Sequence, residues 1–491
     1  MGFPLAFFIF AAGTVGLFYL DRDNRSKSSR ALWLPVIWLW IIGSRPVSAW
    51  LGIWLGVGQS GAAGQGLDAQ LDGSPTDALV FMVLLAAGIA VLLRRKRDTV
   101  SALSSSAPVL IYLLYCLLSC LWSPFPDVAF KRWTKNVGDL AMVLVIVTDP
   151  EPIAALRRVF SRVGFILLPA SILLIRYSTL GQTYDPSGNQ SYTGVTTNKN
   201  SLGLITFVIS LGAVWNCLNV LRADRNSQRS RQLLARVTLV AFGVAVLQQA
   251  RSATSNACFM FGSALILATS LSFFRQRPQR VHALVLTIIL TAGVAMLSGG
   301  EATVAGAFGK DPNLSDRTTI WAAVIPVCPN PVFGAGFESF WNGYGKYVTG
   351  GLSKYERGLN SAHNGYIEVW LNLGWVGIGL IAMLLISAYR QASTAFRINP
   401  EVGSVMLAYV ATTSIYSITE AGFRIMTPTL IFLFLVLVGS RKIASSANGG
   451  NEKPDGILEE KSRAHVWTQD PGVDIQGPLT QNLRRVGVEV L

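Results

Sequence analysis

Apolar residues along this chain are gathered into long blocks that alternate with polar connections. Most blocks approach or exceed the length that a helix needs to cross a hydrocarbon core about 30 Å thick. We therefore predict an all-α fold, a polytopic bundle of about twelve or thirteen transmembrane helices. The expected spans are residues 2–20, 31–57, 78–93, 106–122, 137–148, 163–177, 201–221, 237–250, 256–274, 281–298, 366–389, 401–419 and 427–439.

Composition agrees with this pattern. Hydrophobic residues make up 51% of the chain and charged residues only 14%, which excludes an ordinary soluble globular protein. The net charge of +14 follows from the connections, since every second one is basic. These connections hold 23 of the 41 Lys and Arg residues, so we expect them to be cytoplasmic. The positive charge thus indicates orientation, and no nucleic-acid partner is expected.

The pattern divides the chain into four regions. Residues 1–298 are expected to form transmembrane helices 1 to 10, residues 299–363 a large periplasmic loop, residues 364–443 the last transmembrane helices, and residues 444–491 a disordered cytoplasmic tail. The large loop is rich in aromatic residues, which either build a small core, lie at the membrane interface or stack on sugar rings. They are Trp321, Phe333, Phe337, Phe340, Trp341, Tyr344, Tyr347 and Tyr355.

The most informative stretch runs from Ser361 through His363 and Asn364 into the span 366–389. Ser361 is placed to cap a helix whose first turn contains His363. The positive end of the helix dipole favours a neutral, proton-accepting imidazole there, which suits a general base. Gly374 lies eleven residues further on, about 16 Å deeper, and together with Gly377 it predicts close packing against another helix.

A lone histidine at this place could equally be a polar anchor or a helix cap, but its spacing is specific. His363-Asn364, nine residues, then Gly374-x-x-Gly377 is similar to the His-[Asn/Ser/Gln]-x9-Gly-x-x-[Gly/Thr/Tyr] signature of O-antigen ligases and related oligosaccharyltransferases. On this basis the chain resembles the O-antigen ligase and polysaccharide polymerase superfamily over roughly residues 100–440. Further family-like segments are residues 197–203, 250–253 and 315–321, while residues 43–50 look like the exopolysaccharide-production members.

The resemblance implies a membrane glycosyltransferase with a GT-C-like helical bundle. Such an enzyme moves a glycan from a polyprenyl-pyrophosphate carrier to a glycan or lipid A core acceptor, at the periplasmic face of the bacterial inner membrane. It needs no metal and no cofactor. Expected partners are the lipid-linked donor, the acceptor, the bilayer and other polysaccharide-assembly membrane proteins.

Three cations are candidates for holding the donor pyrophosphate. Arg251 lies at the outer tip of a helical hairpin, and its alternative role is interfacial snorkelling. Arg317 lies in a family-like segment, and its alternative is an ordinary loop or helix-start charge. Lys199 precedes the span 201–221, and its alternative is a membrane anchor. With His363 as base, Arg317 and Arg251 complete the candidate catalytic set, and Lys199 is a candidate for substrate binding.

Other polar residues have less specific roles. Asn364 and Glu368 are candidates for substrate binding, and Glu368 could instead orient His363 or pair helices. Glu420 and Arg424 share one face after the span 401–419, where they could pair with each other.

Four functions compete. The motifs favour a polymerase of lipid-linked repeat units, with an O-antigen ligase as the alternative. An oligosaccharyltransferase acting on pilin shares the histidine motif. A lipid-linked glycan flippase or transporter is disfavoured, because the spans carry few charges near the bilayer midplane and the chain has no evident internal repeat.

Overall fold

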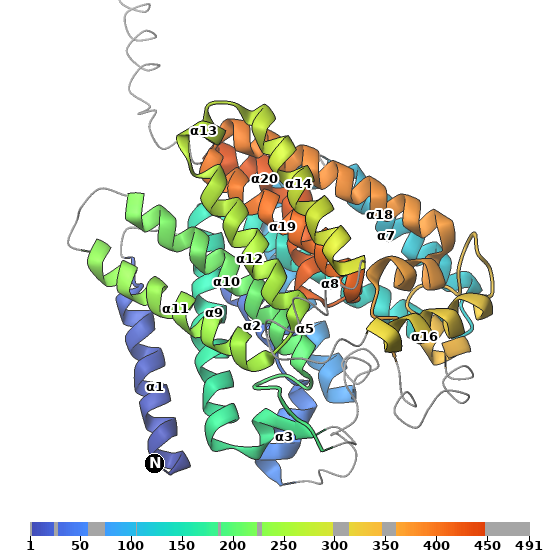
Figure 1. Cartoon of the computed structure of the whole chain (residues 1–491), viewed down its shortest axis with the longest axis horizontal. Helices are drawn as coiled ribbons and strands as arrows, with labels where there is room; N and C mark the ends of the chain where they lie inside the picture. The colour runs from blue at the N-terminus through green and yellow to red at the C-terminus, as the bar shows by residue number, and fades with distance from the viewer. Residues whose placement is uncertain are drawn as a thin grey trace, which may run out of the picture. The chain divides into compact units, whose positions relative to one another are not determined.

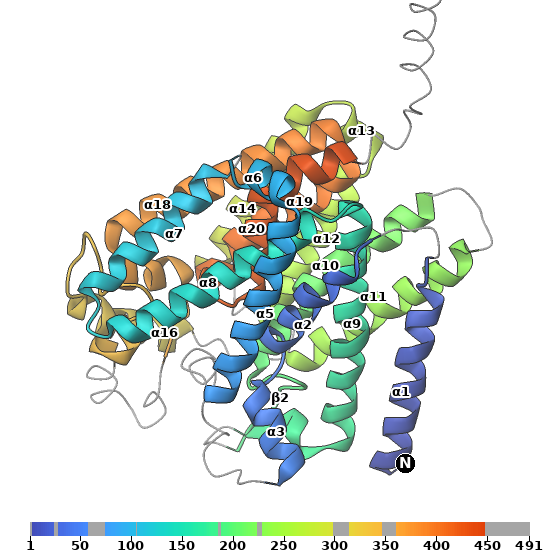
Figure 2. The same cartoon turned by 180° about the vertical axis from the view of Figure 1, so that it is seen from behind.

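The computed structural model describes residues 2–23, 28–56, 74–104, 106–184, 188–222, 228–297, 314–345 and 360–446. This part is helical apart from one antiparallel pair of short strands and the connecting loops (Figures 1 and 2). The expected tail beyond residue 446, and residues 298–313 and 346–359 of the large loop, lie outside the described residues. The elements are α1 (Phe3–Leu20), η1 (Arg30–Leu32), α2 (Trp33–Ile42), α3 (Val47–Leu55), α5 (Pro75–Arg94), α6 (Lys96–Ser104), α7 (Ala107–Ser119), η3 (Cys120–Trp122), α8 (Pro126–Val147), α9 (Pro152–Tyr177), η4 (Thr179–Gly181), β1 (Gln182–Tyr184), β2 (Gln190–Tyr192), α10 (Lys199–Arg222), α11 (Arg229–Ala250), α12 (Ala253–Thr269), α13 (Ser272–Arg275), α14 (Pro278–Leu297), α16 (Leu314–Val324), η5 (Ile325–Val327), η6 (Phe340–Asn342), α18 (Gly365–Ile398), α19 (Pro400–Thr419) and α20 (Pro428–Ser446).

The fold is that of a polytopic helical membrane protein, as the apolar pattern predicts. Among the described residues, eight helices are long and apolar enough to cross a membrane, or up to ten if each of two bent helix pairs is one span. α12 and the apolar part of α14 are shorter. The expected total of twelve or thirteen spans therefore stays a prediction. α1 lies at the edge of the bundle beside α9 and α11 (Figures 1 and 2).

The block at residues 31–57 is not one straight span. α2 ends at Ile42, and α3 begins at Val47 after a bend of 72°. At the bend, a Cβ on Gly43 would lie 2.7 Å from Cγ1 of Ile205 on α10. Pro46 then precedes the first turn of α3. Hydropathy alone predicted a single helix because both halves are strongly apolar.

The expected short span 137–148 is the second half of a longer helix, α8. Arg132 and Lys135 precede the expected span and Asp139 lies near its start; these charges lowered the hydropathy of the segment, yet all three are buried in the protein. Asp139, for example, accepts hydrogen bonds from Trp38 Nε1 at 2.8 Å and from the Met426 amide at 2.9 Å. Charges that face protein partners can lie at membrane depth, so this helix begins earlier than hydropathy indicated.

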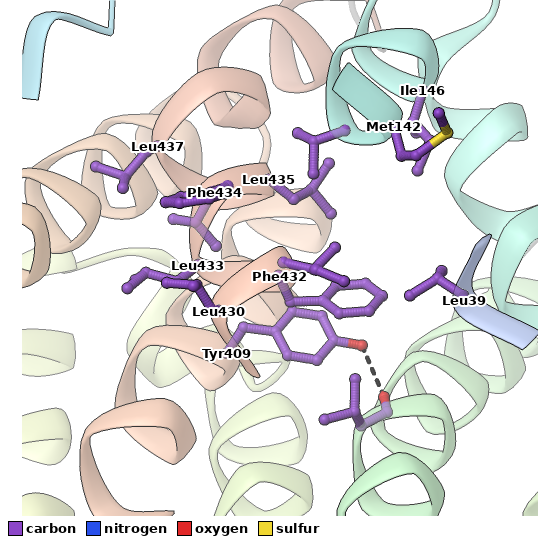
Figure 3. Close-up of a cluster of buried hydrophobic side chains, with 14 of the residues drawn as sticks. Leu39, Met142, Ile146, Tyr409, Leu430, Phe432, Leu433, Phe434, Leu435 and Leu437 are labelled. Carbon is purple, nitrogen blue, oxygen red and sulfur yellow. Dashed lines mark hydrogen bonds between the residues drawn. The ribbon is translucent and has the colours of Figure 1, made fainter. Parts of the chain in front are cut away.

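The centre of the bundle is formed by α19 and α20, which are buried along nearly their whole length. Phe432 stacks on Tyr409 with ring centroids 4.7 Å apart, and the Tyr409 hydroxyl donates to the Val208 carbonyl at 2.9 Å (Figure 3). α19 ends at Thr419, and the candidate site lies at that end.

Candidate functional site

His363 lies immediately before α18 in a left-handed backbone conformation, with φ of 47°. The helix cap is not Ser361, as predicted, but Asn364, whose Oδ1 accepts hydrogen bonds from the amides of Tyr366 and Ile367 at 2.9 and 3.1 Å. Ser361 Oγ accepts from the His363 amide at 3.1 Å instead. His363 is therefore outside the first turn, and the cap and the turn before it fix the direction of its side chain.

Two candidate residues from distant parts of the sequence meet at one carboxylate, that of Glu420. His363 Nδ1 lies 3.2 Å from Glu420 Oε2, and Arg317 Nη2 lies 3.0 Å from Glu420 Oε1. Asn200 at the start of α10 also donates to Oε1, at 2.9 Å. The structure thus brings His363 and Arg317 together around Glu420, a residue to which the sequence assigned no catalytic part.

Glu420 is ionised in this setting. It follows α19 directly and is only 6% exposed. Burial alone would raise its pKa, but the hydrogen bond from His363 and the positive charges of Arg317 and Lys199 outweigh burial and lower the pKa below its usual value. Lys199, the first residue of α10, thus acts on the same carboxylate through its charge.

Helix α16 presents two residues of the family-like segment to the histidine motif. Arg317 reaches Glu420, and Trp321, four residues later on the same helix face, donates from Nε1 to the Ala362 carbonyl at 2.8 Å. The spacing Arg317-x-x-x-Trp321 therefore has a physical reason. One helix face contacts the Glu420 carboxylate, which pairs with His363, and also the Ala362 carbonyl, which precedes His363 in the chain.

Arg251 lies in the tight turn between α11 and α12. It ends α11 in a left-handed conformation with φ of 47°, and its side chain is exposed. Three residues later, the Thr254 hydroxyl is 2.8 Å from the hydroxyl of Thr419, the residue before Glu420. Arg251 makes no hydrogen bond or ion pair with any residue that the structure describes. It borders the Glu420 centre without contacting it.

Glu368 is placed differently from a residue that contacts substrate. It is 2% exposed, and its carboxylate accepts hydrogen bonds from Trp341 Nε1 at 2.7 Å and from the Ala362 amide at 3.0 Å. Its position fits the predicted alternative, orientation of His363. Arg424 pairs with Glu338 at 3.0 Å, so the expected pairing of Arg424 with Glu420 is wrong.

The nearest neighbours of Gly374 and Gly377 do not belong to another helix, although their spacing predicted helix packing. Gly374 interrupts α18 with φ of 64° and ψ of −162°. A Cβ there would lie 2.2 Å from the backbone of Val332 in the large loop, while a Cβ on Gly377 would meet Leu373 of its own helix at 2.3 Å. Trp375 and Val376 donate their amides to the carbonyls of the loop at residues 331–332. The motif glycine thus anchors the large loop to α18.

The aromatic residues of the large loop are divided between a small core and an exposed surface. Phe340 and Trp341 are buried in a cluster with Ala362 and Leu371. Other side chains line an open cavity of about 430 Å³. Its residues are Trp122, Pro329, Asn330, Phe333, Gly334, Ala335 and Tyr344. Tyr347 and Tyr355 lie outside the described residues.

His282, at the start of α14, contacts the Tyr389 hydroxyl in the second half of α18. Since Tyr389 is 26 residues after His363 in the sequence, a helix rise of 1.5 Å per residue separates the two histidines by roughly 40 Å along α18. No group of three or more His, Cys, Asp or Glu side chains suited to a metal is present in the described ranges.

Comparison with known proteins agrees with this arrangement. Residues 236–382 match the model of the family described as O-antigen ligase. The chain is also 26% identical over 299 residues to the exopolysaccharide production protein ExoQ of Rhizobium meliloti (strain 1021). That match covers 57% of this chain and 64% of the relative, slightly less than two thirds of the relative's length. These findings confirm that the chain, a multi-pass membrane protein, resembles the O-antigen ligase and polysaccharide polymerase superfamily and its exopolysaccharide branch.

Proposed function

We propose that this chain is a membrane glycosyltransferase that polymerises polyprenyl-pyrophosphate-linked oligosaccharide repeat units of an exopolysaccharide or O-antigen. The reaction takes place on the periplasmic face of the bacterial inner membrane. The observation that carries the proposal is the meeting of His363 and Arg317 at Glu420. A base and a cation side by side are what glycan transfer from a pyrophosphate carrier requires.

His363 acts as the general base. Because its Nδ1 faces the Glu420 carboxylate at 3.2 Å, the hydrogen bond assigns the proton to Nδ1 and leaves the lone pair on Nε2. Nε2 accepts the proton of the acceptor hydroxyl as that oxygen attacks the anomeric carbon of the donor. The new glycosidic bond forms while the bond from the anomeric carbon to the pyrophosphate oxygen breaks, with inversion.

The cations hold the pyrophosphate and stabilise its charge as it leaves. Arg317 is oriented by Glu420, and Lys199 lies in the field of the same carboxylate. Arg251 has no partner among the described residues, so its guanidinium can bind phosphate oxygens with several parallel hydrogen bonds. Asn364 positions His363 by capping α18. The proposed mechanism assigns no step to a metal or cofactor.

A ligase is the second candidate, because the matched family is described as O-antigen ligase. A ligase would use the same donor and the same base, but its acceptor would be lipid A core. Similarity to a protein named for exopolysaccharide production favours the polymerase.

Deletion of the gene from its host tests the proposal. Lipid-linked repeat units, free exopolysaccharide and lipopolysaccharide are compared by gel and mass spectrometry, with wild-type, His363→Ala and His282→Ala copies reintroduced. His282 is the matched control, since it contacts Tyr389 far along α18 from the candidate site.

We expect wild type and His282→Ala to restore polymer, and His363→Ala to accumulate single lipid-linked repeats. Long lipid-linked polymer that never reaches lipid A core would support the ligase instead. Full activity of a well-expressed His363→Ala protein would refute the assigned mechanism.

A further inference from the structure

A second cluster of charges lies beside the Glu420 centre and is fully enclosed. Arg424 Nε is 3.0 Å from Glu338 Oε2 and 3.9 Å from Glu368 Oε1. Arg424 and Glu368 are each 2% exposed and Glu338 is 7% exposed. We call these three residues the buried charge network. Their burial excludes direct contact with a glycan, so the network must act through other residues if it acts in transfer at all.

The network holds both ends of the backbone segment 360–362, which leads into His363. Arg424 Nη1 donates to the Asn360 carbonyl at 2.9 Å. Two residues later, the Ala362 amide donates to Glu368 Oε2 at 3.0 Å. The segment 360–362 is therefore held in two places by charged groups, and hydrogen bonds to charged groups are stronger than those between neutral ones. His363 follows this segment directly.

Backbone strain is concentrated at the same place. In the described part of the chain, four residues other than glycine have a positive φ, namely Arg251, Glu338, His363 and Met426. Two of these residues, Glu338 and Met426, flank Arg424 in space or in sequence. The Met426 amide is fixed by Asp139, and the Ile425 amide donates to Glu338 Oε1 at 3.4 Å. Such conformations persist only where the surroundings over-determine them, and they cluster at functional sites.

We infer that Arg424, with Glu338 and Glu368, is a positioning residue for His363. The buried charge network fixes the segment 360–362 so that the imidazole lies beside Glu420. Stability alone does not account for this network, because apolar residues of similar volume are often as stabilising as buried ions. The inference rests on the proposed function, in which His363 is the base.

The first arm of the test is kinetic. Arg424→Lys keeps the charge but loses the planar fork that reaches Glu338 and Asn360 together. Full-length protein in proteoliposomes is assayed with graded amounts of the lipid extract of the deletion strain. We expect kcat to fall by about 10- to 100-fold, since a shift of about 1 Å in a reacting group has an effect of that size. KM should change less than about twofold, because the network does not contact substrate.

Matched variants separate this effect from general damage. Arg236→Lys makes the same change in a partly buried ion pair elsewhere in the bundle, in which Arg236 Nε lies 3.3 Å from Asp21, and it should leave kcat unchanged. If Arg424→Lys does not fold, Glu338→Gln takes its place in the test. It removes the negative charge that pairs with Arg424 and should lower kcat in the same way.

The second arm measures the position of residue 363 without activity. His363→Cys is introduced together with Cys217→Ser and Cys328→Ser, because the other three cysteines are buried. Labelling by a membrane-impermeant maleimide is then compared with and without Arg424→Lys. We expect the labelling rate to change at least about threefold with Arg424→Lys and to stay constant with Arg236→Lys.

The two arms also separate the inference from the proposed function. Unchanged kcat and unchanged labelling in Arg424→Lys overturn the inference, as does an equal loss of kcat in Arg236→Lys. If His363→Ala were active, the proposed function would fail, while the labelling arm would still decide whether Arg424 fixes the backbone at residue 363.

Discussion

Gly374→Ala should detach the large loop from α18. The glycine adopts φ of 64° and ψ of −162°, a region that side chains essentially exclude. An added Cβ would also lie 2.2 Å from the carbonyl carbon and oxygen of Val332 and 2.5 Å from the Phe333 amide nitrogen. Because these are backbone atoms, no side-chain rotation can relieve the clash. Either the loop or the helix must move.

The loss of unfolding free energy can be estimated from the interactions that such a movement breaks. The strained backbone conformation alone costs about 1–3 kcal/mol for a residue with a Cβ. Four backbone hydrogen bonds join the loop to α18 around this glycine, and they are donated by Ala335, Gly336, Trp375 and Val376. Each contributes about 0.5–1.5 kcal/mol. Loss of some of them with the strain amounts to about 3–6 kcal/mol, or roughly 3–6 °C in the unfolding midpoint of a chain of this size.

Thermal unfolding of the purified protein in detergent measures the loss of stability. Polymer production in the deletion strain measures the loss of activity. The control is Gly379→Ala on the same helix, where an added Cβ would meet nothing within 4 Å. That change should be neutral or stabilising by up to about 1 kcal/mol, since alanine favours helix. If both variants unfold at the same temperature and both make polymer, the proposed role of Gly374 as the loop anchor is incorrect.

Three further predictions concern the site. The lowered pKa of Glu420 means that its contribution to stability is complete above its usual value of 4.5 and is lost as pH falls below that value. Between pH 6 and pH 3.5 the unfolding midpoint of wild type should therefore fall more than that of Glu420→Gln, and equal falls would contradict the ion-pair geometry. Asn364→Ala should cost about 1 kcal/mol and lower transfer, whereas Asn399→Ala removes the same kind of cap from α19 and should lower only stability. A matching loss of polymer in both cap variants would argue against a special role for Asn364. Arg251→Gly should keep or raise the unfolding midpoint, because it relieves a positive φ of 47°, yet polymer on gels should be lost; retained polymer would remove Arg251 from the mechanism.

Local sequence was sufficient for the helices and for part of the site. Long apolar blocks determine helices in a membrane because each backbone amide must be satisfied within its own segment. The same reasoning failed at the start of α18, where Asn364 caps the helix and not Ser361 as predicted. In α16, Arg317 and Trp321 lie on one face by helical periodicity. Such features depend on neighbours a few residues apart.

Contacts between distant segments were decided by the tertiary structure. Glu420 meets His363 across 57 residues and Arg317 across 103, and only the packing of α16, α18 and α19 brings them together. Hydropathy also missed the first half of α8, since it averages over a window and cannot show that charged residues such as Arg132 and Asp139 face protein partners. The spacing of Gly374 and Gly377 predicted close packing against another helix, whereas Gly374 packs against the large loop. Small residues permit close approach equally by a helix or by a loop, so the spacing alone could not identify the partner.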